Sequence, residues 1–174
     1  MVARAQLREL GLGRRAIGHR AETGRLHPVF RGVYAVGHRV LSLDARWTAA
    51  VLAGGPGAVL SHRSAAALWR IHSTARSRVE ITVPRGRRSR PGIDVHRSSL
   101  PPDEVTGVRG IPVTTVPWTL IDLAAVVDGD HVVRAAREAE VLRLCDLLSL
   151  DDLTARYSRR ARISAIKAAL AAAR

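Results

Sequence analysis

The order of the predicted elements at the start of the chain restricts its fold more than any other feature. Residues 3–10 and 14–23 each have the composition of a short helix, and a Gly-Leu-Gly turn separates them. Residues 25–36 contain two β-prone runs around a turn, which predicts a hairpin. Helix, tight turn, helix and hairpin is the order of a winged helix-turn-helix, which we expect in residues 1–38.

The remainder of the chain, residues 39–174, alternates predicted helices and strands. Capping residues and apolar periodicity predict helices at 44–53, 61–71, 116–127, 131–144 and 163–174, and a capping box at 149–152 opens another short helix. Alternating β-rich runs predict strands at 79–83, 93–97, 105–108 and 111–113. We therefore expect an α+β protein whose second domain has a small antiparallel sheet and C-terminal helices. Trp69 and Trp118 lie in apolar helices and are predicted to be core residues.

The positive charge is confined to the first part of the chain. The formal net charge is +13. Residues 1–100 contain 18 arginines and five acidic residues, whereas residues 101–174 contain ten basic and ten acidic residues. A field of one sign in one region attracts a polyanion, usually nucleic acid. The alternative is a solvated basic face whose Arg content reflects a GC-rich genome, although such a bias does not explain why the acids are absent from one part.

Composition also excludes several classes of protein. No apolar run approaches the ~20 residues of a membrane span. The N-terminus lacks the charged start and apolar stretch of a signal peptide. The one cysteine, Cys145, permits neither an intramolecular disulfide nor a zinc site built from cysteines. We expect a cytoplasmic protein without a cofactor or a membrane partner.

The second predicted helix carries side chains that would face DNA. At about 100° per residue, Ile17 and Ala21 share the inward face, and Arg15 and His19 lie on the opposite face. If this helix enters a major groove, Arg15 and His19 would reach base edges. Phosphate, backbone or minor-groove contacts would fall to Arg14, Arg20, Arg25, His27 and Arg31. The alternative is an exposed basic helix without a partner.

The densest basic cluster lies in a Gly- and Pro-rich loop between two predicted strands. Residues 85–92 contain four arginines, Arg85, Arg87, Arg88 and Arg90. Such a loop is suited to holding phosphates, and a solvated hairpin tip is the equal alternative.

Patterns that resemble catalytic motifs do not meet the requirements of those motifs. Residues 11–16 have the G-x-G-x-x-A spacing of a dinucleotide site, but a helix rather than a strand precedes them. Ser61 and His62 are interpreted as a helix cap and a first-turn residue, not as a nucleophile and its base. Glu80 and Asp94 form a weak pair for a nuclease metal, and no His and carboxylate spacing indicates a metal site. We expect no enzymatic activity.

Several stretches, taken in order, resemble the AbiEi-like antitoxin family. They are residues 3–7, 24–27, 31–37, 58–69, 110–115 and 119–124, among them Arg-Gly-Val-Tyr-Ala-Val-Gly and Ala-Val-Leu-Ser-His-Arg-Ser-Ala-Ala-Ala-Leu-Trp. That family joins an N-terminal winged helix to an α+β C-terminal domain. The resemblance implies a bacterial regulator of a type IV toxin–antitoxin system that represses its own operon and opposes a nucleotidyltransferase-like toxin. It also places Gln6, Arg14, Arg15, His19 and Arg20 in the helix-turn-helix and Arg31 in the wing.

The chain departs from the family pattern at two places. Relatives usually carry another helix before the segment that starts here at Val2, so the winged helix is expected to be reduced. Pro117-Trp118-Thr119 stands where relatives often have Ala-Arg-Thr, which removes a positive charge from the C-terminal domain.

The expected partners are double-stranded DNA and, through the resemblance, a toxin encoded nearby. Two alternatives remain open. The chain also resembles the front part of actinobacterial proteins that carry a Vsr-like endonuclease domain, so it would be a non-catalytic fragment of such a protein. Otherwise the charge-balanced helices of residues 131–174 would dock a partner, and the chain would be a protein-interaction module.

Overall fold

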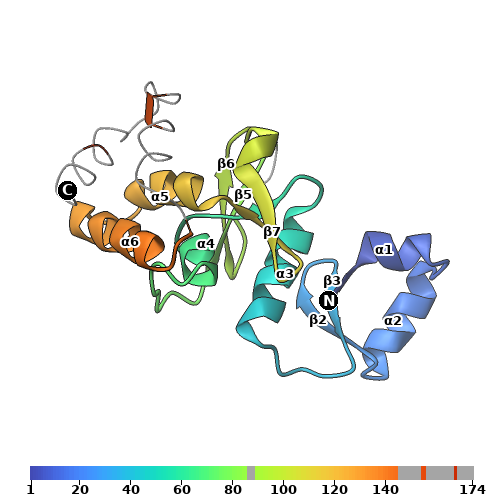
Figure 1. Cartoon of the computed structure of the whole chain (residues 1–174). Helices are drawn as coiled ribbons and strands as arrows, with labels where there is room; N and C mark the ends of the chain where they lie inside the picture. The colour runs from blue at the N-terminus through green and yellow to red at the C-terminus, as the bar shows by residue number, and fades with distance from the viewer. Residues whose placement is uncertain (86–88, 145–153, 156–166, 168–174) are drawn as a thin grey trace.

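The computed structural model describes residues 1–85, 89–144, 154–155 and 167 of the chain (Figure 1). The capping box at 149–152 and the helix at 163–174, except residue 167, lie outside these residues, as do Arg87, Arg88 and Cys145. In the described part, no helix is long and apolar enough to cross a membrane.

The first 36 residues form an N-terminal module that matches the predicted order of elements. Its helices are α1 (Arg4–Glu9) and α2 (Arg14–Glu22), and its strands are β1 (Val2–Ala3), β2 (Leu26–Phe30) and β3 (Val33–Val36). The strands make an antiparallel sheet in the order β1-β3-β2. Strand β1 was not predicted, because a two-residue strand leaves no periodicity in the sequence.

A small apolar core holds the N-terminal module together. Leu7, Ile17, Leu26 and Tyr34 are buried in one cluster, with Ala21 packed against it. The predicted inward face of the second helix is therefore confirmed. Because the cluster joins both helices to both strands of the hairpin, it fixes the orientation of α2 relative to the hairpin.

The second module begins at α3 and contains a five-stranded sheet in the order β6-β5-β4-β8-β7. Its strands are β4 (Val59–Leu60), β5 (Val79–Val83), β6 (Ile93–Arg97), β7 (Val105–Val108) and β8 (Ile111–Thr114). Its helices are α3 (Leu43–Gly54), α4 (His62–Leu68), the 3-10 turn η1 (Pro102–Glu104), α5 (Val116–Ala124) and α6 (Gly129–Val141). These elements confirm the α+β class. Strand β4 was missed, for the same reason as β1.

The sheet is mixed rather than antiparallel as predicted. β5 runs parallel to β6 and β4 runs parallel to β8, whereas the β4–β5 and β7–β8 pairs are antiparallel. The Pro-Gly turn that indicated a hairpin is real, but it pairs Arg90 with Ile93 instead of pairing β5 with β6. The chain turns at Pro91 and Gly92, and β6 then starts with Ile93 opposite Val79, the first residue of β5.

Helices cover both faces of the five-stranded sheet. Helix α3 packs on one face, where Trp47 and Ile81 belong to the same core cluster. Helix α4 lies on the other face, with α5 and then α6 packed beyond it around a second cluster. Trp118 is fully buried in α5, as predicted, and the half-buried Trp69 packs against both clusters.

The two modules share part of their core. Val33 of β3 is buried in the cluster around α3, and Val29 and Phe30 of β2 pack against that cluster. One face of the hairpin thus packs in the core of the N-terminal module and the other face packs against the second module. The tip of the hairpin lies beside the second module (Figure 1).

Candidate nucleic-acid interface

Helix α2 presents a basic face opposite its buried side. Arg14, Arg15 and His19 are exposed, whereas Ile17 is only 3% exposed. Arg20 is half-buried, and its Nη1 donates a hydrogen bond to the carbonyl of Ala16 at 3.3 Å. The side chains predicted to reach base edges are therefore free to do so, and Arg20 lies closer to its own helix.

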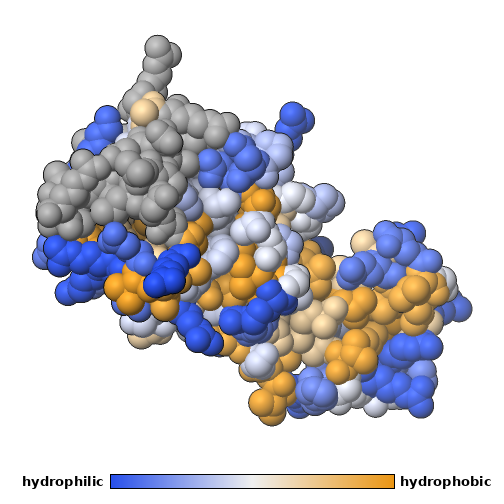
Figure 2. Space-filling model, viewed as in Figure 1, coloured by the Kyte–Doolittle hydropathy of each residue, from blue (hydrophilic) through white to orange (hydrophobic). Residues whose placement is uncertain are grey.

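Two further predicted contacts lie on the hairpin. Arg25 is exposed just before β2, and Arg31 is exposed at the hairpin tip beside Gly32. Among the described residues, neither these two guanidinium groups nor those of Arg14 and Arg15 form an ion pair. Their charge is therefore directed to solvent, and Figure 2 shows hydrophilic surface at two ends of the N-terminal module, with an apolar band between them.

Gln6 caps the N-terminus of α1, a role that the sequence did not indicate. Its Oε1 accepts a hydrogen bond from the backbone N–H of Ala3 at 2.8 Å, which closes the N-terminus of α1. The side-chain oxygen is thus engaged within the module.

The predicted basic loop is anchored at its C-terminal end. Arg85 is exposed and Arg90 is half-buried. The carbonyl of Arg90 accepts a hydrogen bond from Nη2 of Arg78 at 3.0 Å, and Nε of Arg78 donates to Oδ1 of Asp94 at 2.7 Å. The backbone that carries Arg90 is thereby held against β6.

A buried polar cluster lies between β5 and α4, apart from the basic surface. Glu80 accepts hydrogen bonds from the backbone N–H of Arg63 at 2.9 Å and from its Nη1 at 3.0 Å. The backbone N–H of Glu80 donates to Oγ of Ser64 at 2.9 Å. The imidazole rings of His62 and His96 stack with centroids 3.5 Å apart. Glu80 shares a face of β5 with Thr82, because alternate residues of a strand point the same way, and His96 is the register partner of Thr82 on β6.

The cluster does not have the geometry of a nucleophilic triad. Ser61 Oγ lies 3.0 Å and Asp122 Oδ2 lies 3.6 Å from the same ring nitrogen, Nδ1 of His62. A proton relay needs its nucleophile and its carboxylate on different ring nitrogens. Ser61 occupies the predicted N-cap position of α4, but its hydroxyl accepts from Oγ1 of Thr82 at 2.8 Å and does not cap the helix.

The two carboxylates considered as metal ligands, Glu80 and Asp94, are each paired with an arginine. Glu80 and Asp94 are register partners on β5 and β6, but Glu80 bonds to Arg63 and Asp94 bonds to Arg78. Nε2 of His96 lies 3.6 Å from Oε1 of Glu80. Within the described residues, no group of three or more His, Cys, Asp or Glu side chains is arranged to hold a metal ion.

The comparison with known families bears on the second module. Residues 45–171 match the model of the AbiEi antitoxin C-terminal domain. The chain belongs to the AbiEi antitoxin family. The matched segment starts within α3, so it contains the whole five-stranded sheet and the buried polar cluster.

A solved structure supports the fold of this AbiEi-family chain. The crystal structure of the RV2827C protein from Mycobacterium tuberculosis is similar with a TM-score of 0.53 and 18% identity, over 87% of this chain and 63% of that one. At this identity the likeness concerns the fold alone, and the chain spans 63% of the length of that protein. No curated protein matches the sequence.

The sequence singles out several residues of the polar cluster of this AbiEi-family domain, but it does not predict that they lie together. Ser61 and His62 were assigned to a helix start, and Glu80 was noted only as half of a metal pair. The available signal was the alternation in residues 79–83, which directs Glu80 and Thr82 to the face opposite the apolar residues. What covers that face depends on the placement of α4, which the alternation does not specify.

His62 makes the stability of the AbiEi domain depend on pH. Burial of the ring, with the charges of His96 and Arg63, lowers the pKa of His62 from 6.5 to about 3, against the opposing effect of Glu80. Between these two values the unfolded chain binds a proton that the folded protein excludes. The free energy of unfolding should therefore fall as the pH drops from about 6.5 towards 3, by at most about 1.4 kcal/mol per pH unit for this group.

Urea unfolding between pH 7 and pH 4 tests this expectation with His62→Asn. Asparagine tolerates the positive φ of 51° at this position. The variant should lose stability less steeply with falling pH than the wild type, whereas His38→Asn, at an exposed histidine, should follow the wild type. Equal slopes for His62→Asn and the wild type would refute the assignment.

Proposed function

We propose that this AbiEi-family chain is a DNA-binding antitoxin of a type IV toxin–antitoxin system. In this proposal the N-terminal module binds double-stranded DNA upstream of its own operon and represses it. The AbiEi domain opposes a nucleotidyltransferase-like toxin encoded nearby. The family match supports the antitoxin role, and the exposed basic face of α2 carries the proposal of DNA binding.

The geometry of the N-terminal module suits a helix-turn-helix interaction with DNA. Ile17 packs α2 against Leu26 and Tyr34 of the hairpin, so the opposite face of the helix is held outward. Arg15 and His19 project from that face without an ion-pair partner among the described residues, and arginine is the side chain that most often recognises guanine in the major groove. Arg14, Arg25 and Arg31 surround them and are available to phosphates.

Replacement of Arg15 by alanine should weaken binding to the upstream DNA and relax its sequence preference. The loss of one base contact costs about 1–3 kcal/mol, roughly tenfold or more in affinity. Fluorescence anisotropy with the upstream duplex and a shuffled duplex, at several salt concentrations, measures both effects. Arg134→Ala removes one exposed charge from α6, which lies at the other end of the molecule, and serves as the control (Figure 1).

Two results would contradict the DNA-binding proposal. One is the absence of any complex with the upstream duplex at low salt, where phosphate contacts are strongest. The other is equal behaviour of Arg15→Ala and Arg134→Ala on both duplexes.

The antitoxin role is tested separately, by growth of cells that express the neighbouring gene product. Co-expression of the full chain should restore growth, and Arg15→Ala should restore it equally when both genes are under an independent promoter. Failure of the wild-type chain to restore growth would refute the antagonism while leaving the DNA-binding result intact.

A further inference from the structure

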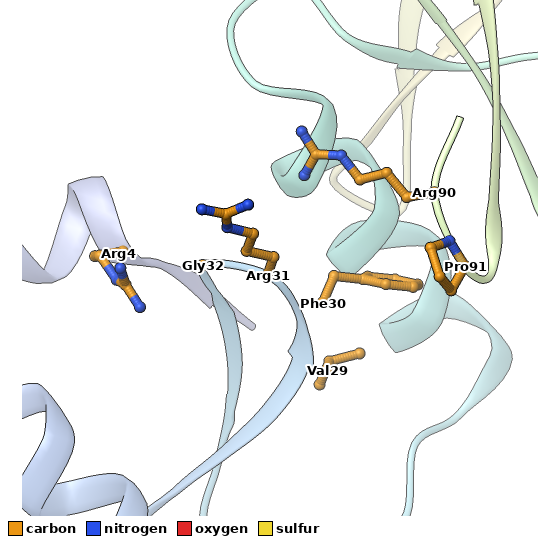
Figure 3. Close-up of a pocket in the computed structure, with 7 residues that line it drawn as sticks. All are labelled: Arg4, Val29, Phe30, Arg31, Gly32, Arg90 and Pro91. Atoms are coloured by element: carbon orange, nitrogen blue, oxygen red, sulfur yellow. The ribbon is translucent and has the colours of Figure 1, made fainter. Parts of the chain in front are cut away.

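A cleft of about 670 Å³ lies between the hairpin tip and the second module. Three arginines from separate elements border it: Arg4 at the start of α1, Arg31 at the hairpin tip and Arg90 on the loop before β6. Figure 3 shows Arg31 between Arg4 and Arg90, with Phe30 and Pro91 next to one another on one side. The cleft is thus composite, with walls from both modules.

Backbone contacts fix the positions of Arg4 and Arg31 relative to each other. The N–H of Arg4 donates to the carbonyl of Gly32 at 2.7 Å, which ties the first turn of α1 to the hairpin tip. Nη2 of Arg4 donates to the hydroxyl of Tyr34 at 2.8 Å, and that tyrosine is buried. Arg4 therefore keeps its other guanidinium donors for the cleft while its side chain is oriented.

A close contact brings Arg90 to the same place. Gly92 has a φ of +79°, and a Cβ built there would lie 3.1 Å from Cε1 of Phe30. The aromatic ring at the hairpin tip therefore packs directly on the loop that carries Arg90. Because Arg90 is paired with Ile93 and its carbonyl accepts a hydrogen bond from Arg78, the backbone of Arg90 is fixed at this place.

No acidic side chain among the described residues balances the charges of this cleft. None of the residues that line it is acidic, and within the described chain neither Arg31 nor Arg90 forms an ion pair. Asp94, which follows the loop in β6, is bonded to Arg76 and Arg78. Three guanidinium groups gathered without a counter-charge favour an anion, and their planar sets of donors match phosphate oxygens.

We propose that this cleft is a nucleotide-phosphate site. The three guanidinium groups bind the phosphate oxygens, and Val29, Phe30 and Pro91 provide an apolar floor for the attached sugar or base. The ligand is a phosphodiester of bound DNA or the phosphates of a free nucleotide. Only the first source rests on the proposed function. In either case the ligand contacts both modules at once and holds the hairpin tip against the second module.

The double variant Arg31→Ala/Arg90→Ala tests the site in two assays. Its control is Arg134→Ala/Arg137→Ala, which removes the same two charges from exposed positions on α6. The first assay measures affinity for the upstream duplex as a function of salt. The second is a calorimetric titration of the DNA-free protein with adenosine triphosphate and, separately, with inorganic tripolyphosphate at low salt. Circular dichroism establishes that all variants are folded before either assay.

If DNA supplies the phosphate, the cleft variant should bind the duplex roughly tenfold more weakly at low salt than the control variant. The slope of log affinity against log salt should become less steep by about 2, because two counterion-releasing contacts are lost. If a free nucleotide is the ligand, the cleft variant should bind DNA like the control but lose the calorimetric signal. Binding of adenosine triphosphate but not of tripolyphosphate would show that the apolar floor contributes to the affinity.

The failures of the site and of the proposed function can be told apart. A wild-type chain that does not bind DNA but binds the triphosphate, with the signal lost in the cleft variant, refutes the proposed DNA binding and supports the site. A wild-type chain that binds DNA, with both double variants alike in both assays, refutes the site and leaves DNA binding intact. A wild-type chain that binds neither ligand refutes both.

Discussion

Replacement of Trp118 by alanine is expected to lower the free energy of unfolding by about 3–5 kcal/mol. Trp118 lies in the first turns of α5 and has no exposed surface. Its removal leaves a cavity the size of an indole within α5, a helix that packs against α4 and α6. A close-packed interior relaxes into such a cavity only partly. Urea unfolding followed by circular dichroism measures the change.

A total stability of about 5–15 kcal/mol is typical of a domain, so the alanine variant is at risk of not folding. Trp118→Phe keeps most of the volume and should lose clearly less than the alanine variant. A loss below about 1 kcal/mol for Trp118→Ala would show that the helix does not depend on this side chain.

Replacement of Glu80 by glutamine should have a comparable effect, about 3–5 kcal/mol, for an electrostatic reason. Glu80 is 3% exposed and is bonded to both the backbone and the guanidinium of Arg63, which also donates to the carbonyl of Val126. Burial alone would raise the pKa of Glu80, but His96, His62 and Arg63 outweigh it and hold the pKa below its ordinary value. Removal of the carboxylate charge leaves the Arg63 cation largely buried without a counter-ion.

Asp94→Asn is the matched control for Glu80→Gln. Asp94 is the register partner of Glu80 on β6, and its ion pairs with Arg76 and Arg78 are much more exposed. Loss of this pairing should cost no more than about 1 kcal/mol. If the two variants lose equal stability, burial does not determine how much the Glu80–Arg63 pair contributes to the free energy of unfolding.

Most elements of the fold could be predicted from the sequence, because periodicity and capping residues are local signals. The helix pair of the N-terminal module, the hairpin, and the strands at 79–83 and 93–97 all lie within a few residues of the prediction. The pairing of those two strands could not be predicted, because the Pro-Gly turn before β6 has the same sequence whether it joins neighbours in a hairpin or only bends the loop. Strands β1 and β4 are set by their partners, not by their own residues.

Part of the candidate site could likewise be predicted from the sequence, and part could not. The outward placement of Arg15 and His19 follows from helical periodicity and the buried Ile17. The convergence of Arg4, Arg31 and Arg90 does not, because these residues are far apart in the sequence. They meet through the hydrogen bond between Arg4 and Gly32 and the contact between Phe30 and Gly92. The uneven distribution of charge pointed to the loop that carries Arg90 as a candidate for phosphate contacts, but it did not indicate that Arg4 and Arg31 lie beside that loop.

The position of β4 in the sheet has a consequence for synthesis of the protein on the ribosome. Leu60 pairs on one side with Ile81 and on the other with Val113, so its second partner emerges roughly 50 residues after it, several seconds at the usual rate of translation. The N-terminal module needs no such wait, since its sheet closes within the first 36 residues. During elongation the nascent chain therefore carries a complete hairpin module followed by an apolar strand with one open edge, and a chaperone that binds such edges would have its target around Leu60.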